Sequence, residues 1–426
     1  MKVFFDTVGC RLNQAEIELM AGQFRSAGHE ILDHPDGADL VVVNTCSVTA
    51  AAASDSRQKT RQAHLAGAGK ILLTGCWATL EPEKAAALEG VNEVVSNLEK
   101  MDIPLRVLRV EENLIDLDPI ARKPLPGAHA RTRAFIKVQD GCDNFCTYCV
   151  TRLARGKNLS EPKEEILKDI QRAEAGGGRE VVLSGVHLAS WGREAAHGES
   201  IRDLLKYLLD HTSIERIRLS SIEPWNLDEE FFELWQNPRL CRHLHLPLQS
   251  GSEGVLKRMA RHTTPAAYSK LVGMARTAIP EVAITTDIIV GFPGETSAEF
   301  EESLDFVSRL SFSGGHVFRF SPREGTPAAR MTGRVNGSEV KTRADRMREI
   351  LMKGQSDYFK RAIGKTLEVL WEGSGKRDKH GWTLHGLSDQ YIQVTARAAE
   401  NRWNRIDRVE ITSADQNGVY GNIIEF

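Results

Sequence analysis

Three of the seven cysteines in this 426-residue chain lie within one loop, and the rest of the chain is organised around that loop. The three are Cys142, Cys146 and Cys149. They follow the apolar run from Phe135 to Val138, which is typical of a β-strand. Thiolates are soft ligands that favour zinc, copper(I) or iron–sulfur clusters, and three of them in one loop can reach one metal centre without help from distant chain. The pattern therefore predicts a strand that ends in a metal-binding loop.

This loop supplies three ligands and no fourth. A closed structural zinc site would need another nearby Cys or His, and the next histidine downstream is His187. Three ligands with one open position are expected for an iron–sulfur cluster whose remaining iron binds another molecule. The alternative, three cysteines buried as small apolar residues, would require this close spacing to arise by chance.

Three further cysteines each come shortly after a short apolar run. These cysteines are Cys10, Cys46 and Cys76, and the runs are Val3 to Phe5, Leu40 to Val43 and Ile71 to Leu73. The runs alternate with helical segments, which indicates βαβ units and a parallel sheet. Because ligands bind at the carboxyl ends of strands in such sheets, the three cysteines can meet at one edge. Each one alone could be a small buried residue, but the repeated position favours a shared metal site.

Helices are predicted between these strands at Asn13 to Ala27 and at Ser54 to Leu65, with Gly28 and Gly67 as their stops. Asn13 is either a polar contact near the cysteines or the cap of its helix.

A connector with several prolines, from about Met101 to Ala130, precedes the three-cysteine loop, and we place a domain boundary within residues 121–131. Beyond it, strands and helices alternate six times. The strand candidates are Ala134 to Gln139, Glu180 to Ser184, Arg216 to Ser220, His243 to Leu246, Val282 to Val290 and Gly315 to Phe320. Six successive β/α units predict a parallel barrel or open half-barrel whose active site lies at the carboxyl ends of the strands.

After Lys365, short strand-like runs separated by turns predict a small antiparallel barrel. Such modules often bind RNA through basic and aromatic side chains. From Lys365 onward the chain has eight basic and nine acidic residues, so a purely structural barrel is equally consistent with the composition.

The net charge of −3 excludes a protein that is basic throughout. Two stretches are basic, residues 121–157 and 330–365, and either can form an RNA-binding surface or an ordinary solvated helix face. The N-terminus reaches Asp6 too soon for a signal peptide, and no apolar run approaches the ~18 residues of a membrane span. We therefore expect a cytoplasmic protein, in whose reducing surroundings cysteines more often bind metals than form disulfides.

The loop from Cys142 to Cys149, with Tyr148 before the last cysteine, resembles the cluster loop of the radical S-adenosylmethionine (SAM) superfamily. In that superfamily the three thiolates hold a [4Fe-4S] cluster, SAM chelates the fourth iron, and the aromatic position lies beside the adenine. Other positions resemble its SAM-contacting motifs: Gly177, Gly178, Glu223, Gln249 and Ser250. The two glycines can equally be a helix stop followed by a turn.

The full chain resembles the radical SAM methylthiotransferase family. The resemblance rests on the three N-terminal cysteine motifs, the cluster loop, and the segments Ser184 to Leu188, Leu246 to Ser252 and Gly291 to Glu295. It implies that Cys10, Cys46 and Cys76 hold a second, auxiliary [4Fe-4S] cluster. Within the family, the segments Val186 to Leu188 and His316 to Pro327 look most like the MtaB type, which methylthiolates C2 of threonylcarbamoyladenosine beside the tRNA anticodon.

The expected architecture is α/β with three parts: an N-terminal open parallel-sheet domain over residues 1–120, a partial (β/α)6 barrel over 128–364, and a small antiparallel β-barrel resembling the RNA-binding TRAM module over 365–426. The resemblance also implies a tRNA substrate and a reductant such as flavodoxin or ferredoxin. An adenine C2–H bond is too inert for a general base, so radical chemistry from the cofactor suits this reaction. Other functions stay open: methylthiolation of isopentenyladenosine or of a ribosomal protein aspartate, and a non-enzymatic, metal-stabilised RNA-binding protein.

Overall fold

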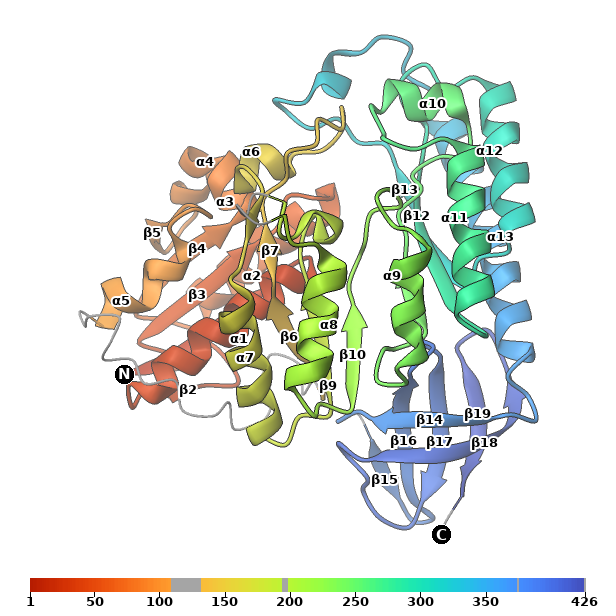
Figure 1. Ribbon diagram of the computed structural model, residues 1–426. Helices are drawn as coiled ribbons and strands as arrows, with labels where there is room; N and C mark the ends of the chain where they lie inside the picture. Colours follow the sequence, from red (N-terminus) through yellow and green to blue (C-terminus); the bar gives the residue numbers. More distant parts are fainter. Residues whose placement is uncertain (109–131, 194–197, 374, 425–426) are drawn as a thin grey trace. The chain divides into compact units, whose positions relative to one another are not determined.

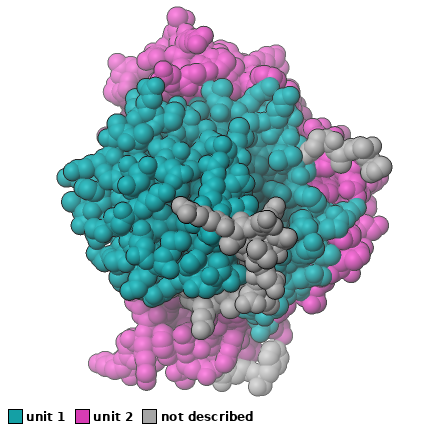
Figure 2. Space-filling view, turned by 90° about the vertical axis from the view of Figure 1, so that its left-hand side faces the viewer, with its two compact units in different colours: residues 1–144, 149–187, 194–196 teal, residues 145–148, 188–193, 197–426 magenta. Residues whose placement is uncertain are grey.

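The computed structural model describes residues 1–108, 132–193, 198–373 and 375–424 (Figure 1). Within these residues the chain forms two compact units. The first comprises the described residues up to 144 together with 149–187, and the second comprises 145–148, 188–193 and the described residues from 198 onward (Figure 2). The boundary predicted within residues 121–131, and the domain limits expected at residues 120 and 128, lie outside the described residues.

A five-stranded parallel sheet forms the N-terminal part of the first unit. In spatial order its strands are β2 (Glu30–Ile31), β1 (Lys2–Thr7), β3 (Leu40–Thr45), β4 (Lys70–Gly75) and β5 (Val91–Val94). Its helices are α1 (Arg11–Ser26), α2 (Ala50–Leu65), α3 (Cys76–Leu80), α4 (Pro82–Ala86), the 3-10 turn η1 (Lys100–Asp102) and α5 (Ile103–Leu108). The three predicted apolar runs are therefore β1, β3 and β4.

Both faces of this sheet are buried, because successive side chains of a strand point to opposite sides and both sides are apolar here. Val3 and Phe5 face α1, where Phe24 packs edge-on against Phe5 with ring centroids 5.5 Å apart. On the other face, Phe4 belongs to the same core as Trp77 of α3. Packing on both faces therefore fixes the positions of the strand ends.

The first unit also contains the beginning of the predicted half-barrel. Its elements are β6 (Ala134–Lys137), β7 (Gln139–Asp140), α6 (Thr151–Arg155), β8 (Leu159–Ser160), α7 (Lys163–Ala175) and β9 (Glu180–Ser184). β6 and β9 pair in parallel, and β7 and β8 pair antiparallel. Helix α1 reaches these strands as well, because Ala15 packs with Phe135 and Val182. One helix thus contacts both the N-terminal sheet and the strand that leads to the three-cysteine loop.

The second unit continues the β/α alternation. Its elements are η3 (Leu188–Ser190), α8 (Ile201–His211), β10 (Arg216–Leu219), α9 (Glu229–Glu233), η4 (Leu234–Gln236), β11 (His243–His245), α10 (Glu253–Arg258), α11 (Pro265–Ala278), β12 (Ala283–Val290), α12 (Ser297–Leu310), β13 (Gly314–Arg319), η5 (Pro327–Arg330) and α13 (Gly337–Lys360). Strands β11, β12 and β13 form a parallel sheet, and parallel bridges join the β10 region to the β11 region. The six strands predicted for the half-barrel are β6, β9, β10, β11, β12 and β13.

Strands β14 to β19 close into a small barrel at the C-terminal end of the second unit (Figure 1). They are β14 (Thr366–Trp371), β15 (Lys376–Asp378), β16 (Gly381–Ser388), β17 (Gln393–Ala398), β18 (Ile406–Ala414) and β19 (Val419–Ile423). The order β14-β18-β19-β17-β16 returns to β14, while β15 extends the sheet beside β16. The prediction of a barrel is confirmed, but it is not fully antiparallel, because β17 and β19 pair in parallel.

Five of the ten basic side chains at residues 330–365 pair with carboxylates. On α13, Arg343 is buried and bonded to Glu295, with 2.8 Å between Nη1 and Oε2. Arg346 pairs with Glu301 in the same way on the surface. These pairs weaken the case for an RNA-binding surface on this helix and agree with the alternative of an ordinary charged helix face. Among the described residues, no helix has the length and apolar character needed to cross a membrane.

Candidate functional site

Three neighbouring strands of the N-terminal sheet end at a cysteine. Cys46 and Cys76 are the first residues after β3 and β4, whose last residues, Thr45 and Gly75, are aligned in the parallel register. Cys10 follows β1, the other neighbour of β3, and caps the start of α1. The predicted convergence of these cysteines at one sheet edge therefore follows directly from the strand order.

Glycines let the backbone of this edge pack closely. Gly9 has φ +99°, and a Cβ on it would lie 2.4 Å from the sulfur of Cys46. Gly75 has φ +94°, and a Cβ there would lie 2.3 Å from the carbonyl oxygen of Thr45. Both positions require glycine. A side chain at either one would overlap Thr45 or Cys46 at the end of β3, and other residues disfavour the positive φ.

Two of the three cysteines at this edge, Cys46 and Cys76, are buried, and Cys10 is exposed. Burial raises the pKa of the Cys46 thiol to about 12. Desolvation also raises the pKa of Cys10, while the charge of Arg155 acts to lower it. A soft cation that binds Cys46 as a thiolate would offset this desolvation penalty.

The donor set at this edge consists of three cysteine sulfurs. Thiolates are soft ligands that suit iron–sulfur clusters, so the residue types fit such a group. Among the described residues, no three His, Cys, Asp or Glu side chains are grouped closely enough to hold a metal ion as they stand.

Two asparagines contact the sulfurs. The Cys10 thiol donates to Asn13 Oδ1, with 3.6 Å between the atoms, and Asn97 Nδ2 donates to the sulfur of Cys76 over 3.4 Å. Asn13 is fully buried, and its amide also donates to the carbonyls of Val8 and Thr45. The interpretation of Asn13 as a helix cap is wrong, since Cys10 occupies that position; Asn13 joins the ends of β1 and β3 instead.

The loop of Cys142, Cys146 and Cys149 runs through both units. Cys142 and Cys149 belong to the first unit and Cys146 to the second. In the first unit, buried Gln139 fixes the start of the loop by donating to the carbonyl of Gly141 over 2.7 Å and accepting from the amides of Val186 and His187. The residues after β9 therefore hold this end of the loop in place.

In the second unit, the segment around Cys146 is anchored by its backbone. The amide of Thr147 donates to the Met259 carbonyl over 3.1 Å, and its own carbonyl accepts from Ala328 over 2.8 Å. Tyr148 packs edge-on against Phe292, with 6.5 Å between ring centroids. The aromatic residue expected beside the adenine is thus part of a small apolar cluster.

Arg261 contacts the sulfur of Cys146, with Nη1 at 3.9 Å. Its other Nη donates to the Pro247 carbonyl over 2.6 Å, and its guanidinium lies over the ring of Trp225, 4.5 Å from the centroid. Burial raises the pKa of Glu223 to about 7, even though the charge of Arg261 opposes that shift. Arg261 thus lies beside the central cysteine of the loop, and its charge also acts on the buried Glu223.

The other predicted SAM-contacting residues fall into two groups. Gln249 and Ser250 follow β11, and the amide of Gln249 donates to the Asp287 carbonyl, so both lie at the carboxyl end of the β11–β12 pair. Gly177 and Gly178 precede β9, where their amides bond back to the carbonyls at the end of α7. The two glycines act as the helix stop that was the alternative interpretation and lie at the opposite end of the strand from the cysteine loop.

Cys241 lies apart from both cysteine sets. It is buried just before β11, and its carbonyl accepts from the indole of Trp235 over 2.8 Å. Its burial and its place at the amino end of a strand are those of a structural thiol.

Sequence reasoning did not single out Gln139, Arg155 or Arg261. The first two lie close to the three-cysteine loop in sequence, and that position was the available signal. Arg261 is far along the chain, and only the packing of α10 onto the loop segment brings it to Cys146.

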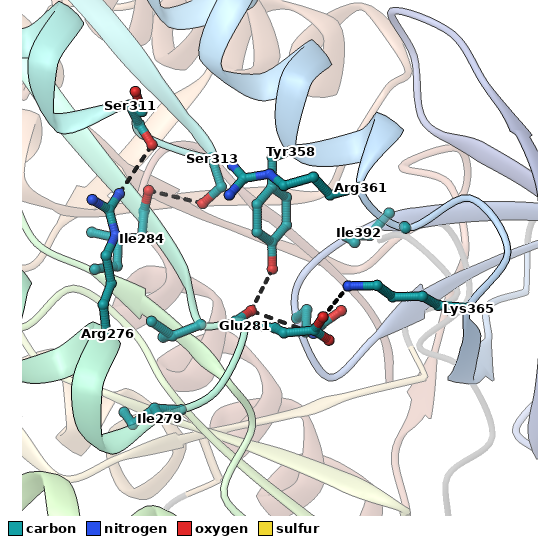
Figure 3. A pocket seen from close by; sticks show the side chains of 13 residues that line it. Arg276, Ile279, Glu281, Ile284, Ser311, Ser313, Tyr358, Arg361, Lys365 and Ile392 are labelled. Atoms are coloured by element: carbon teal, nitrogen blue, oxygen red, sulfur yellow. Dashed lines mark hydrogen bonds and ion pairs between the residues drawn. The ribbon is translucent and has the colours of Figure 1, made fainter.

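Two cavities lie in different surroundings. One of about 390 Å³ opens beside Cys10 and is lined by Gly9, Gln14 and Lys59 among others. Another of about 290 Å³ lies in the second unit, where Glu281 accepts from Lys365 and its carbonyl accepts from the Tyr358 hydroxyl (Figure 3). The second cavity is lined by residues of both the half-barrel and the C-terminal barrel. None of the predicted site residues lines it.

Two family models match the chain. The model described as Radical SAM superfamily matches residues 136–307, and the one described as Uncharacterized protein family UPF0004 matches residues 2–96. The first match covers the predicted barrel strands up to β12, and the second covers the cysteine-edged sheet.

Several curated proteins are similar over nearly the full length. The chain is 38% identical to the "Threonylcarbamoyladenosine tRNA methylthiotransferase MtaB" of Thermotoga maritima, over 98% of this chain and 96% of that protein. It is 35% identical to the protein of the same name from Bacillus subtilis, over 97% and 94%. It is 32% identical to the "tRNA-2-methylthio-N(6)-dimethylallyladenosine synthase" of Maricaulis maris, over 99% and 97%.

Among solved structures, the chain resembles the radical S-adenosylmethionine methyltransferase TsrM from Kitasatospora setae. The TM-score is 0.58 at 14% identity, covering 77% of this chain and 75% of that one. At this identity the likeness concerns the fold alone.

Proposed function

This chain belongs to the radical SAM tRNA methylthiotransferases, and we propose on that premise that it methylthiolates C2 of N6-threonylcarbamoyladenosine beside the tRNA anticodon. The observation that carries the proposal is the 38% identity to the MtaB protein of Thermotoga maritima across 98% of the chain. The position of Cys10, Cys46 and Cys76 at one sheet edge supports it from the structure. Because the substrate is tRNA, we place the reaction in the cytoplasm.

A second candidate substrate is dimethylallyladenosine in tRNA, the isopentenyl-type base. The observation that favours it is the 32% identity to the Maricaulis maris enzyme over 99% of the chain. The two substrates share the adenine C2 position and differ in the N6 group, so the same chemistry would serve both. The higher identity to the MtaB proteins favours the threonylcarbamoyl base.

Membership of the radical SAM superfamily brings a [4Fe-4S] cluster and SAM as cofactors. We propose Cys142, Cys146 and Cys149 as the ligands of this cluster, since they are the chain's only three cysteines in one loop. When bound, the cluster and SAM supply the radical that removes the C2 hydrogen. We further propose that Cys10, Cys46 and Cys76 hold a second [4Fe-4S] cluster, which provides the sulfur.

The protein's own share is to position these groups. Gln139 fixes the start of the cluster loop by a hydrogen bond to the Gly141 carbonyl, and Arg261 donates a hydrogen bond to the sulfur of Cys146. Glu223, Gln249 and Ser250 lie after β10 and β11 and are proposed to contact SAM, with Tyr148 beside the adenine. Gly177 and Gly178 are not included, because they lie at the amino end of β9.

The partners follow from the reaction. Each turnover needs an electron from outside, for which we propose flavodoxin or ferredoxin. We propose that the C-terminal barrel assists tRNA binding, because Lys376 and Arg377 are exposed on β15, paired with β16, where Trp382 is half-buried.

Deletion of the gene tests the proposed substrate. Mass spectrometry of digested tRNA should show loss of 2-methylthio-N6-threonylcarbamoyladenosine and accumulation of the base without the methylthio group. The intact gene supplied in trans should restore the product, whereas a Cys10→Ala gene should not. Loss of the dimethylallyl product instead would favour the second candidate. Unchanged tRNA with an altered ribosomal protein digest would overturn the assignment to tRNA.

The contact of Arg261 with Cys146 predicts a change in redox potential. The Arg261→Gln variant should shift the midpoint potential of the SAM-binding cluster downward by on the order of 50 mV, because a positive charge and a hydrogen bond to sulfur both favour the reduced cluster. A redox titration followed by electron paramagnetic resonance measures this shift. Arg258→Gln is the control, since that guanidinium pairs with Glu299. Equal potentials in both variants would contradict the proposed effect of Arg261 on the cluster.

A further inference from the structure

A buried arginine links the two segments that carry the cysteine sites. Arg155 is the last residue of α6, the short helix that starts two residues after Cys149, and its side chain is only 1% exposed. Its guanidinium donates to Glu16 Oε1 over 3.0 Å and to Asp140 Oδ1 over 2.9 Å. It also donates to Asn13 Oδ1. Glu16 and Asn13 lie on α1, directly after Cys10.

A second buried cation shares the same carboxylate. Lys100 and Glu16 are both fully buried and form an ion pair. Lys100 also donates to Asn97 Oδ1 over 2.7 Å, and Glu16 accepts from the Asn44 amide over 3.1 Å. Although burial acts to raise it, the charges of Arg155 and Lys100 hold the pKa of Glu16 below its ordinary value. Burial lowers the pKa of Lys100, although the charge of Glu16 opposes that shift, so Arg155 is the firmer of the two cationic partners of Glu16.

Two asparagines of this network, Asn13 and Asn97, contact a cysteine sulfur. Asn13 joins Arg155 to the thiol of Cys10, and Asn97 joins Lys100 to the sulfur of Cys76. Asn97 Nδ2 also donates to the carbonyl of Ala154 over 2.9 Å, directly before Arg155. Side chains from α1, the segment after β5 and α6 thus form one connected set around the sheet edge that carries the cysteines.

Such a network is costly to bury, and well-packed apolar residues would often stabilise a fold equally well. The network differs from ordinary structural support because it contacts the sulfurs of Cys10 and Cys76. Residues that hydrogen-bond to the ligands of a metal hold those ligands in the orientation that binds it.

We propose that Arg155 is a positioning residue, which holds the edge that carries Cys10, Cys46 and Cys76 against the helix that follows the SAM-cluster loop. This inference rests on the proposed function, because it assumes a cluster at Cys10, Cys46 and Cys76. It goes beyond the proposed function because it gives a role to Arg155 and to Glu16 and Asn13, the residues that Arg155 contacts.

The test isolates the auxiliary cluster. The parent protein is the full chain with Cys142, Cys146 and Cys149 changed to alanine, in which only the proposed auxiliary cluster can form. After reconstitution with iron and sulfide it should hold about four irons per chain. If the parent holds no iron, the proposed auxiliary cluster is contradicted, and so is the inference on Arg155, which assumes it. If the parent holds iron, only the Arg155 variants test the inference.

Two variants in this parent decide the role of Arg155. Arg155→Met removes the charge and the forked donor, and Arg155→Lys keeps the charge alone. We expect Arg155→Met to release iron to a chelator about 10- to 100-fold faster than the parent, because loss of a residue that orients metal ligands typically weakens a site by that factor, and Arg155→Lys to fall between. The electron paramagnetic resonance spectrum of the remaining cluster should change in both variants.

The matched control is Arg343→Met. Arg343 is another buried arginine paired with a glutamate, on α13 in the second unit. Thermal unfolding should show that it loses stability as Arg155→Met does, while its iron release and spectrum equal those of the parent. If Arg155→Met fails to fold, Arg155→Lys, which keeps the buried charge, decides the outcome. Parent-like iron release and spectra in the Arg155 variants, or the same changes in Arg343→Met, would overturn the proposal.

Discussion

The Cys10→Ala variant should make no methylthiolated tRNA, while it continues to cleave SAM. A cluster with two of its three ligands cannot be retained in a catalytic position, and even changes next to ligands cost metal sites about 10- to 100-fold. We therefore expect product formation to fall by more than about 100-fold. The loop of Cys142, Cys146 and Cys149 is untouched, so 5′-deoxyadenosine should still form. Liquid chromatography with mass spectrometry measures both products from one reaction.

Cys10 is the best of the three auxiliary cysteines for this experiment. It is exposed, whereas Cys46 and Cys76 are buried, so its replacement leaves the core of the sheet intact. Cys241→Ala is the matched control, because Cys241 is a buried cysteine outside both sets and its loss should leave methylthiolation unchanged. A fully active Cys10→Ala protein would sink the auxiliary-cluster assignment.

The Cys146→Ala variant should lose both activities. Without the central cysteine of the loop, the cluster that binds SAM is incomplete, and no radical can be produced. Formation of 5′-deoxyadenosine and methylthiolation should both fall by more than about 100-fold, since the lost group is itself a ligand. Iron analysis should show about four irons instead of about eight, because the auxiliary cysteines remain.

The contrast between the two variants is the informative part. Cys10→Ala should separate SAM cleavage from methylthiolation, and Cys146→Ala should abolish them together. The same loss of SAM cleavage in both would mean that the two cysteine sets do not hold separate clusters. Normal 5′-deoxyadenosine formation by Cys146→Ala would contradict its role as a cluster ligand.

The strand pattern was sufficient to predict most of the fold. Each short apolar run that ends near a cysteine is a strand, and the six β/α units follow in the expected order. Local sequence determines these elements, because a short continuous apolar run buries both faces of a strand in a parallel sheet. The C-terminal barrel was also predictable, apart from the parallel pairing of β17 and β19, which depends on how the chain crosses the barrel.

Local patterns misled the interpretation where two structures share one signal. Asn13 at the start of a helix looked like a cap, but the helix begins earlier at Arg11, and the amide points to β1 and β3. Gly177 and Gly178 looked like a cofactor motif or a helix stop, and only their place before β9 separates the two. In both cases the residue type was informative, but the sequence did not show which neighbours the residue contacts or at which end of a strand it lies.

The sequence by itself determined the cysteine sets, the strands that carry them and the family, because ligand type, spacing and period are local properties of the chain. Only the tertiary structure decided which charged residues support them. Arg155 and Glu16 are 139 residues apart in sequence, and Lys100 and Glu16 are 84 apart. No local pattern marks such pairs, because a buried ion pair forms only when folding removes both groups from water at the same place.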